Sequence, residues 1–202
     1  MIAILDYGSG NLRSAERAFA LAGSLLGHET VVTADPDLCQ ASDGLVVPGV
    51  GAFGACMEQL LSVRGDLIIK ERANAGKPIL GICVGMQILF ESGSEKGGHS
   101  GLGILEGSVD RIDAPILPHI GWNTVESPTD SRLFQGIHDQ SFYFVHSFAA
   151  KKPVSGAVNS WTEYGEPFLS AVEQGAVSAV QFHPEKSGVA GGQLITHWIS
   201  GF

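Results

Sequence analysis

Short apolar runs alternate with amphipathic segments through the first half of the chain. Four of these runs are mostly apolar on both faces and predict buried strands over Ile2–Leu5, Thr30–Thr33, Gly44–Val47 and Pro78–Ile82. The segments between them carry apolar residues at helical spacing and predict helices over Asn11–Leu26, Ala52–Leu61 and Asp66–Ala75. Apolar strands that alternate with helices are typical of a parallel sheet covered by helices on both sides.

The pattern changes after Gly101. The apolar runs become shorter and more alternating, which predicts antiparallel strands near Leu105–Ile112, Asn123–Glu126, Ser141–Val145, Ala157–Trp161, Leu169–Glu173 and Val177–Gln181. A last amphipathic segment predicts a helix over Val189–Trp198. We therefore expect an α/β fold with a doubly wound, mostly parallel sheet flanked by helices and with antiparallel strands in the C-terminal half. With 202 residues and no repeat or long linker, the chain fits a single domain over residues 1–202.

Composition narrows the classes of protein that remain. Twelve Lys and Arg residues against 21 Asp and Glu give a formal charge of −9, the wrong sign for nonspecific binding to nucleic-acid phosphates. No apolar stretch reaches the roughly 18 residues of a membrane span, and the N-terminus lacks the basic segment of a signal peptide. Three cysteines cannot close a disulfide framework. We therefore expect a cytoplasmic protein without a nucleic-acid or membrane partner.

The clearest chemical signal is Gly81-Ile82-Cys83-Val84-Gly85, which joins an apolar strand to an apolar helical run, Met86–Phe90. This is the cysteine version of a nucleophile elbow, in which a tight strand-to-helix turn exposes the reactive side chain. The flanking glycines remove Cβ atoms that would clash, and the helix N-terminus favours the thiolate. We predict that Cys83 is a nucleophile, the alternative being a buried structural cysteine. Cys39 and Cys56 lack this setting and are expected to be structural.

A candidate base lies in Gln181-Phe182-His183-Pro184-Glu185, at the end of a predicted strand. In an extended chain, positions two apart point the same way, so His183 and Glu185 are expected to lie side by side, with Pro184 keeping His183 extended. A thiol nucleophile needs a base for its proton and a third group to orient the imidazole. The alternative is an ordinary, partly buried histidine. No paired Cys/His spacing suggests a metal, and we expect no cofactor.

Six motifs cover nearly the whole chain in one order. They are Asp6–Asn11, Pro48–Phe53, Gly81–Gln87, Pro118–Asn123, Tyr143–Ser147 and Gln181–Ser187. Together they resemble the triad (class I) glutamine amidotransferase family, although Val84 and Ile120 stand where Leu and Met are more usual. The resemblance implies that Cys83 attacks the side-chain amide of glutamine, giving a glutamyl thioester and ammonia. His183 then shuttles protons while water releases glutamate.

The attack creates an oxyanion, so backbone N–H groups must face it. Val84, next to the nucleophile at a helix start, can offer one. The resemblance places the second donor near Val50 and Gly51, in a loop that must reorient to become active. The alternative is an ordinary glycine-rich turn over Pro48–Phe53.

For the glutamine pocket, the resemblance points to the side chains of Gln87 and Glu95 and to the main chain of Ser147 and Phe148. The alternative for each of these is a plain surface or strand residue. Glu95 falls in a polar, glycine-containing stretch after the nucleophile helix.

The resemblance also implies a partner, a (β/α)₈ cyclase subunit that forms a heterodimer with this chain and uses its ammonia in histidine biosynthesis. One amidotransferase domain fills 202 residues and leaves no room to bind a phosphorylated acceptor. The docking face would include Asn11, Trp122, Asn123 and Lys186. The alternatives are a core aromatic for Trp122 and a solvated side chain for Lys186.

Two other functions stay open at this level. A cysteine hydrolase or redox chaperone of similar fold would use the elbow on a peptide, an ester or an oxidised substrate, and Gln87 and the histidine–carboxylate pair count against it. A catalytically silent binding subunit would keep only the fold. The presence of Cys83, His183 and Glu185 counts against that second function.

Overall fold

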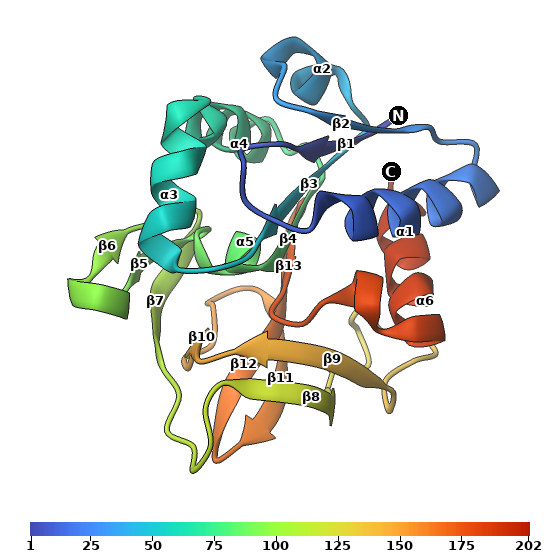
Figure 1. The fold of residues 1–202 in the computed structure, drawn as a ribbon. Helices are drawn as coiled ribbons and strands as arrows, with labels where there is room; N and C mark the ends of the chain where they lie inside the picture. The colour runs from blue at the N-terminus through green and yellow to red at the C-terminus, as the bar shows by residue number, and fades with distance from the viewer.

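A seven-stranded sheet of order β11-β12-β13-β4-β3-β1-β2 forms the centre of the computed structural model, which describes residues 1–202 (Figure 1). Its strands are β1 (Ile2–Leu5), β2 (Thr30–Thr33), β3 (Gly44–Gly49), β4 (Ile79–Cys83), β11 (Val158–Tyr164), β12 (Glu166–Gln174) and β13 (Val177–Val180). Strands β2, β1, β3, β4 and β13 run parallel to one another. Strand β12 pairs antiparallel with β13, and β11 pairs antiparallel with β12. Every residue of β1, β3, β4 and β13 is buried, as expected for strands covered on both faces. The predicted α/β fold is confirmed.

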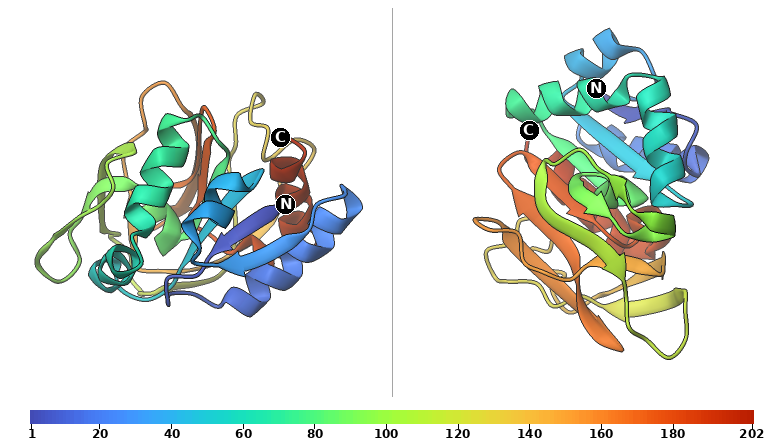
Figure 2. Two further views of the ribbon diagram at one scale, coloured as in Figure 1. Left: turned by 90° about the horizontal axis from the view of Figure 1, so that it is seen from above. Right: turned by 90° about the vertical axis from the view of Figure 1, so that its left-hand side faces the viewer.

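Helices cover both faces of this sheet. They are α1 (Leu12–Leu25), α2 (Pro36–Ala41), α3 (Phe53–Ser62), α4 (Gly65–Asn74), α5 (Val84–Gln87) and α6 (Gly188–Ile199), with 3₁₀ turns η1 (Glu95–Gly97) and η2 (Pro184–Lys186). Helices α1 and α6 lie on one side of the sheet and α3 and α4 on the other (Figure 2). Phe19 of α1 meets Trp198 of α6 edge to face, with ring centroids 5.9 Å apart. None of the helices combines the length and the apolar character that a membrane span requires.

Two smaller sheets complete the chain. One has the order β10-β7-β5-β6 and the other pairs β8 with β9. Their strands are β5 (Phe90–Gly93), β6 (His99–Ser100), β7 (Leu105–Arg111), β8 (His119–Thr124), β9 (Ser141–His146) and β10 (Phe148–Ala150). The backbone N–H of His183 donates to Tyr143 O at 2.9 Å, which ties β9 to the segment that follows β13.

The structure differs from the sequence prediction in several places. The strand at Val177–Gln181, expected among the antiparallel strands, pairs parallel with β4 and antiparallel only with β12. The short strands β6 and β10 were not predicted. Helix α2 was not predicted because it has only six residues; Asp35 caps it by accepting hydrogen bonds from two backbone N–H groups. The helical run expected over Met86–Phe90 ends at Gln87, and Phe90 begins β5. Strand β8 lies at His119–Thr124 rather than at Asn123–Glu126, with Glu126 making only an isolated bridge.

Helix α5 begins directly after β4 and packs closely against β3. A Cβ atom at Gly85 would lie 1.8 Å from the carbonyl oxygen of Val47, and one at Gly81 would lie 2.8 Å from the carbonyl oxygen of Gly85. Both distances are far shorter than any van der Waals contact. Only glycine at these two positions lets the chain turn from β4 into α5 at this separation.

This packing predicts that Gly85→Ala destabilises the protein by about 3 kcal/mol or more, because backbone atoms of β3 would have to move. The measurement is the free energy of unfolding in denaturant. Gly192→Ala is the matched control, since a Cβ atom there would meet nothing within 4 Å. It lies in α6 and should gain about 0.5–1 kcal/mol. Equal stability of the two variants would contradict the close contact.

Candidate active site

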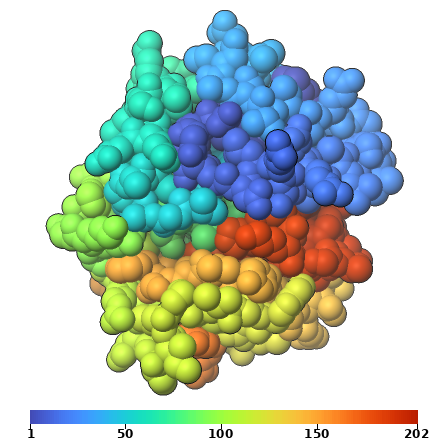
Figure 3. Space-filling model, in the orientation of Figure 1, coloured from blue at the N-terminus to red at the C-terminus, as the bar shows by residue number.

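The carboxyl ends of β3, β4 and β13 meet at one edge of the sheet, where Gly49 is in register with Cys83. A cavity of about 330 Å³ opens there. It is lined by Val50, Gly51, Cys83, Val84, Gln87, Glu95, Pro118, Val145, His146, Ser147, Phe148, His183 and Lys186. Ten of these are residues predicted from the sequence. In Figure 3, the β3–α3 connection (cyan) and β9 (orange) face each other across a seam on this side of the molecule.

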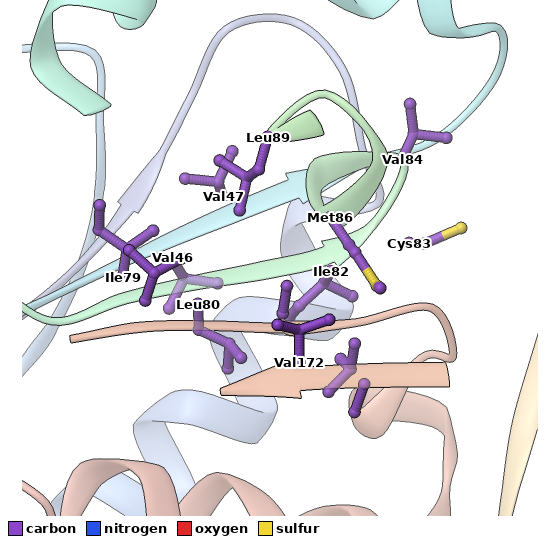
Figure 4. Packing of buried hydrophobic residues seen from close by; sticks show 14 of the residues in the cluster. Val46, Val47, Ile79, Leu80, Ile82, Cys83, Val84, Met86, Leu89 and Val172 are labelled. Carbon is purple, nitrogen blue, oxygen red and sulfur yellow. The ribbon is translucent and has the colours of Figure 1, made fainter. Parts of the chain in front are cut away.

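Cys83 sits on the tight turn that the elbow motif predicted. Its backbone has φ +55° and ψ −113°, a region that residues with a side chain rarely adopt. Figure 4 shows its sulfur turned away from the buried side chains of Ile79, Leu80 and Ile82. The turn therefore delivers the sulfur from a fully buried strand to the wall of the cavity.

His183 lines the cavity together with Cys83 and pairs with Glu185. Its Nδ1 atom lies 2.8 Å from Glu185 Oε1. Burial by itself would lower the pKa of His183, but the hydrogen bonds with Cys83 and Glu185 and the charges of both groups raise it to about 9. The expected extended conformation holds for His183 only, because Pro184 starts the 3₁₀ turn η2. Glu185 reaches the imidazole from inside that turn.

The other two cysteines lie outside the cavity lining. Both are buried, and burial raises the pKa of the Cys39 thiol to about 11. Burial also raises the pKa of Cys56. Their surroundings therefore favour the neutral thiol.

The loop after β3 is held by the first β–α connection of the chain. Val50 N–H donates to Ser9 Oγ at 3.3 Å, and Val50 O accepts from Ser9 Oγ at 3.0 Å and from Cys56 Sγ at 3.2 Å. Tyr7 donates through its hydroxyl group to the carbonyl oxygen of Pro48, two residues before Val50, at 2.5 Å. The peptide groups of Val50 are thus bonded to neighbouring side chains rather than directed to a ligand in the cavity. The sequence predicts neither of these contacts with Val50.

The predicted pocket residues surround the cavity, but two of their polar groups are already bonded. Gln87 Nε2 donates to Phe148 O at 2.8 Å and to Gln181 Oε1 at 2.9 Å. Glu95 Oε2 accepts from the backbone N–H of Phe53 at 2.9 Å and so caps α3. Gln87 Oε1 and the second oxygen of Glu95 accept no hydrogen bond within the protein.

A pair of buried histidines lies beside the pocket, and sequence reasoning assigned neither a role. His146 Nδ1 is 3.1 Å from Phe148 O, and its Nε2 is 3.1 Å from His119 Nδ1. Because a carbonyl only accepts, Nδ1 of His146 carries the proton and Nε2 accepts from His119. Burial lowers the pKa of His119 to about 4 and that of His146 to about 3. Both rings are neutral near pH 7.

Of the four residues expected at a docking face, only Lys186 lines the cavity, and Asn11 lines a smaller pocket that also includes His183 and Glu185. Asn11 and Lys186 are exposed. Trp122 is 59% exposed on β8, which rules out the alternative of a core aromatic. Asn123 is half-buried and donates through Nδ2 to Glu163 O at 3.0 Å. No group of three or more His, Cys, Asp or Glu side chains is arranged to hold a metal ion.

Comparison with known proteins gives one consistent family. The family model "Glutamine amidotransferase class-I" matches residues 3–198. The imidazole glycerol phosphate synthase subunit HisH of Nocardia farcinica is 56% identical over 207 residues, covering 98% of this chain and 96% of that protein. The protein of the same name from Mycobacterium tuberculosis strain H37Rv is 52% identical over 204 residues, covering 99% and 97%.

Solved structures show the same fold at much lower identity. A crystal structure of a glutamine amidotransferase superposes with a TM-score of 0.76 at 20% identity, covering 98% of this chain and 97% of that one. A glutamine amidotransferase from Thermotoga maritima gives a TM-score of 0.62 at 17% identity, covering 99% and 80%.

The site geometry predicts how His183 titrates. Glu185→Gln keeps the side-chain shape but removes the charge, so the pKa of His183 should fall from about 9 by roughly one unit or more. NMR of the imidazole ring across pH measures this shift. Glu58→Gln, at an exposed position, is the matched control. An unchanged midpoint would exclude Glu185 as the partner of His183.

The same shift affects stability. His183 binds its proton more tightly in the folded protein than in the unfolded chain. Its interactions with Cys83 and Glu185 therefore stabilise the fold fully below about pH 6.5. That contribution is lost as the pH rises through about 9, and Glu185→Gln should reduce it.

Proposed function

This chain belongs to the class-I glutamine amidotransferase family, and we propose that it hydrolyses glutamine with Cys83, His183 and Glu185. The observation that carries the proposal is the 2.8 Å pairing of His183 with Glu185, with His183 and Cys83 both lining one cavity. Raising the pKa of His183 to about 9 favours the imidazolium at neutral pH. An imidazolium beside the sulfur favours the thiolate, which is the nucleophilic form.

In the first half of the reaction, the Cys83 sulfur attacks the side-chain carbonyl carbon of glutamine. A C–S bond forms and the carbonyl oxygen becomes an oxyanion. When this intermediate collapses, the C–N bond breaks and His183 gives its proton to the leaving nitrogen, so ammonia departs. In the second half, His183 takes a proton from water, which attacks the thioester and releases glutamate and Cys83. Glu185 orients the imidazole in both halves.

The oxyanion needs donors on both sides of the substrate. Val84 N–H at the start of α5 is the proposed first donor, and the loop at Val50 and Gly51 is the proposed source of the second. Because Val50 N–H is bonded to Ser9, that peptide must rotate before it can serve. This contact supports a resting state of low activity, in which loop movement completes the oxyanion hole.

The ammonia requires an acceptor site. The similar proteins are named as subunits of imidazole glycerol phosphate synthase, which supports a cyclase subunit as the partner. We propose a heterodimer in which a (β/α)₈ cyclase takes up ammonia and makes imidazole glycerol phosphate and an aminoimidazole carboxamide ribonucleotide. Trp122 and Lys186, which are both exposed, suit such a docking face together with Asn11 and Asn123. Free ammonia would protonate in bulk water, so hydrolysis is expected to depend on the bound partner.

The nucleophile assignment predicts the behaviour of all three cysteines. Cys83→Ala should abolish glutamine hydrolysis, whereas Cys39→Ser and Cys56→Ser should retain it if they fold. A diazo-ketone analogue of glutamine should label Cys83 alone, as mass spectrometry of the digested protein would show. Label on Cys56 would overturn the assignment. Turnover of a peptide or ester in place of glutamine would favour the cysteine-hydrolase alternative.

The partner assignment predicts strong activation. Glutamine turnover should rise by orders of magnitude when the cyclase subunit and its nucleotide ligand are added, because loop movement completes the oxyanion hole. Trp122→Ala or Lys186→Ala should weaken binding or activation while the circular dichroism spectrum stays unchanged.

Ser9→Ala is a second arm of the same experiment. It removes the acceptor that holds Val50 N–H, so the chain alone should gain turnover while the fully activated complex changes little. Equal rates for the isolated wild-type chain and the ligand-bound complex would rule out gating.

A further inference from the structure

The orientation of two buried side-chain amides follows from a single backbone carbonyl. Phe148 O can only accept hydrogen bonds, so the atom of Gln87 that lies 2.8 Å from it must be Nε2. The second hydrogen of that nitrogen points to Gln181 at 2.9 Å, where an oxygen must receive it. Gln181 Oε1 therefore faces Gln87, and its Nε2 faces the other way. That nitrogen lies 3.8 Å from Cys83 Sγ.

Gln181 is fixed in this position from several sides. It is 1% exposed, and its backbone N–H donates to Ser170 O at 2.9 Å as the chain leaves β13. Its side chain has no freedom to present the oxygen to Cys83, because this would leave two nitrogens facing each other at the contact with Gln87. The nucleophile is thus met by a neutral N–H donor that does not titrate.

The thiol and the thiolate of Cys83 form hydrogen bonds with different neighbouring groups. The thiol donates to Val145 O at 3.8 Å, whereas the thiolate can only accept. Gln181 Nε2 is a donor, and hydrogen bonds to a charged acceptor are shorter and stronger than bonds between neutral groups. The amide of Gln181 therefore favours the thiolate, alongside the imidazolium of His183.

We propose that Gln181 is a further catalytic residue, which donates a hydrogen bond to the Cys83 thiolate, and that Gln87 acts through it as a positioning residue. The role in turnover rests on the proposed glutaminase function, but the effect on the sulfur does not. Both hydrogens of Gln87 Nε2 are used within the protein, so Gln87 has only Oε1 to offer glutamine. The sequence prediction that Gln87 binds substrate is thereby narrowed to an acceptor role.

The test is the rate of Cys83 alkylation by iodoacetamide as a function of pH, with the label located by mass spectrometry. Gln181→Met keeps the length of the side chain and removes the N–H donor to Cys83. The pH at which the alkylation rate is half-maximal should therefore rise by about one unit. At lower pH this equals a roughly tenfold slower reaction. Gln181→Glu places an anion there and should raise it further. Gln193→Met, at an exposed position on α6, should leave the profile unchanged.

A double-mutant cycle tests the route through Gln87. Gln87→Met frees the amide of Gln181 to rotate and should give a smaller rise than Gln181→Met. In the Gln181→Met background, Gln87→Met should cause no additional shift, because the donor it orients is already gone. Independent shifts that add would assign Gln87 a separate effect on the sulfur and would contradict the positioning role.

The thermal midpoint of each variant checks that it folds. The ultraviolet absorbance of the thiolate gives the same titration and does not depend on whether iodoacetamide can reach Cys83. If Gln181→Met does not fold, Gln181→Glu and Gln87→Met carry the test. An unchanged profile in the folded variants overturns the inference. If the profile shifts as expected but the complex does not hydrolyse glutamine, the proposed function fails and the role of Gln181 at the sulfur stands.

Discussion

The contact between Gly85 and the carbonyl oxygen of Val47 sets the geometry on which the site depends. Because no Cβ atom fits between them, α5 lies directly on β3 and the chain must leave β4 through an abrupt turn. Cys83 occupies that turn with φ +55°, which brings its sulfur out of the buried sheet. Strand β3 also carries the loop at Val50. The same contact therefore fixes Cys83 and the loop relative to each other.

The carbonyl oxygen of Phe148 is the second fixed point of the site. It accepts from Gln87 on one side and from His146 on the other. The first bond fixes the orientation of the Gln87 amide, which leads through Gln181 to Cys83. The second bond fixes the proton on His146 Nδ1, so His146 Nε2 accepts from His119. These two series of hydrogen bonds contain only groups that are neutral at pH 7, namely Gln87, Gln181, His146 and His119. The hydrogen bonds through Gln87 and Gln181 therefore bring no charged group to Cys83.

Local sequence patterns were sufficient to predict the main strands, the larger helices and the placement of Cys83. Each of these depends on neighbours a few residues away, such as the glycines on both sides of the elbow. The pairing of Gln87 with Gln181 spans 94 positions, and that of Ser9 with Val50 spans 41. No periodicity in the chain indicates such a partner, because it arises only when separate strands are brought into register. The same reason explains why His119 and His146 stayed without a role.

The neutral His119–His146 pair makes the β8–β9 region sensitive to acid. In an unfolded chain both rings would protonate near pH 6.5, but burial lowers the pKa of His119 to about 4 and that of His146 to about 3. Below pH 6.5 the unfolded chain thus binds more protons, and each histidine costs the fold up to about 1.4 kcal/mol per pH unit. The charge of His183 lowers the pKa of His146 further. The imidazolium of His183 is lost in alkali, and the neutral His119–His146 pair becomes unfavourable in acid. The two sets of histidines therefore limit, from opposite sides, the pH range in which this arrangement is stable.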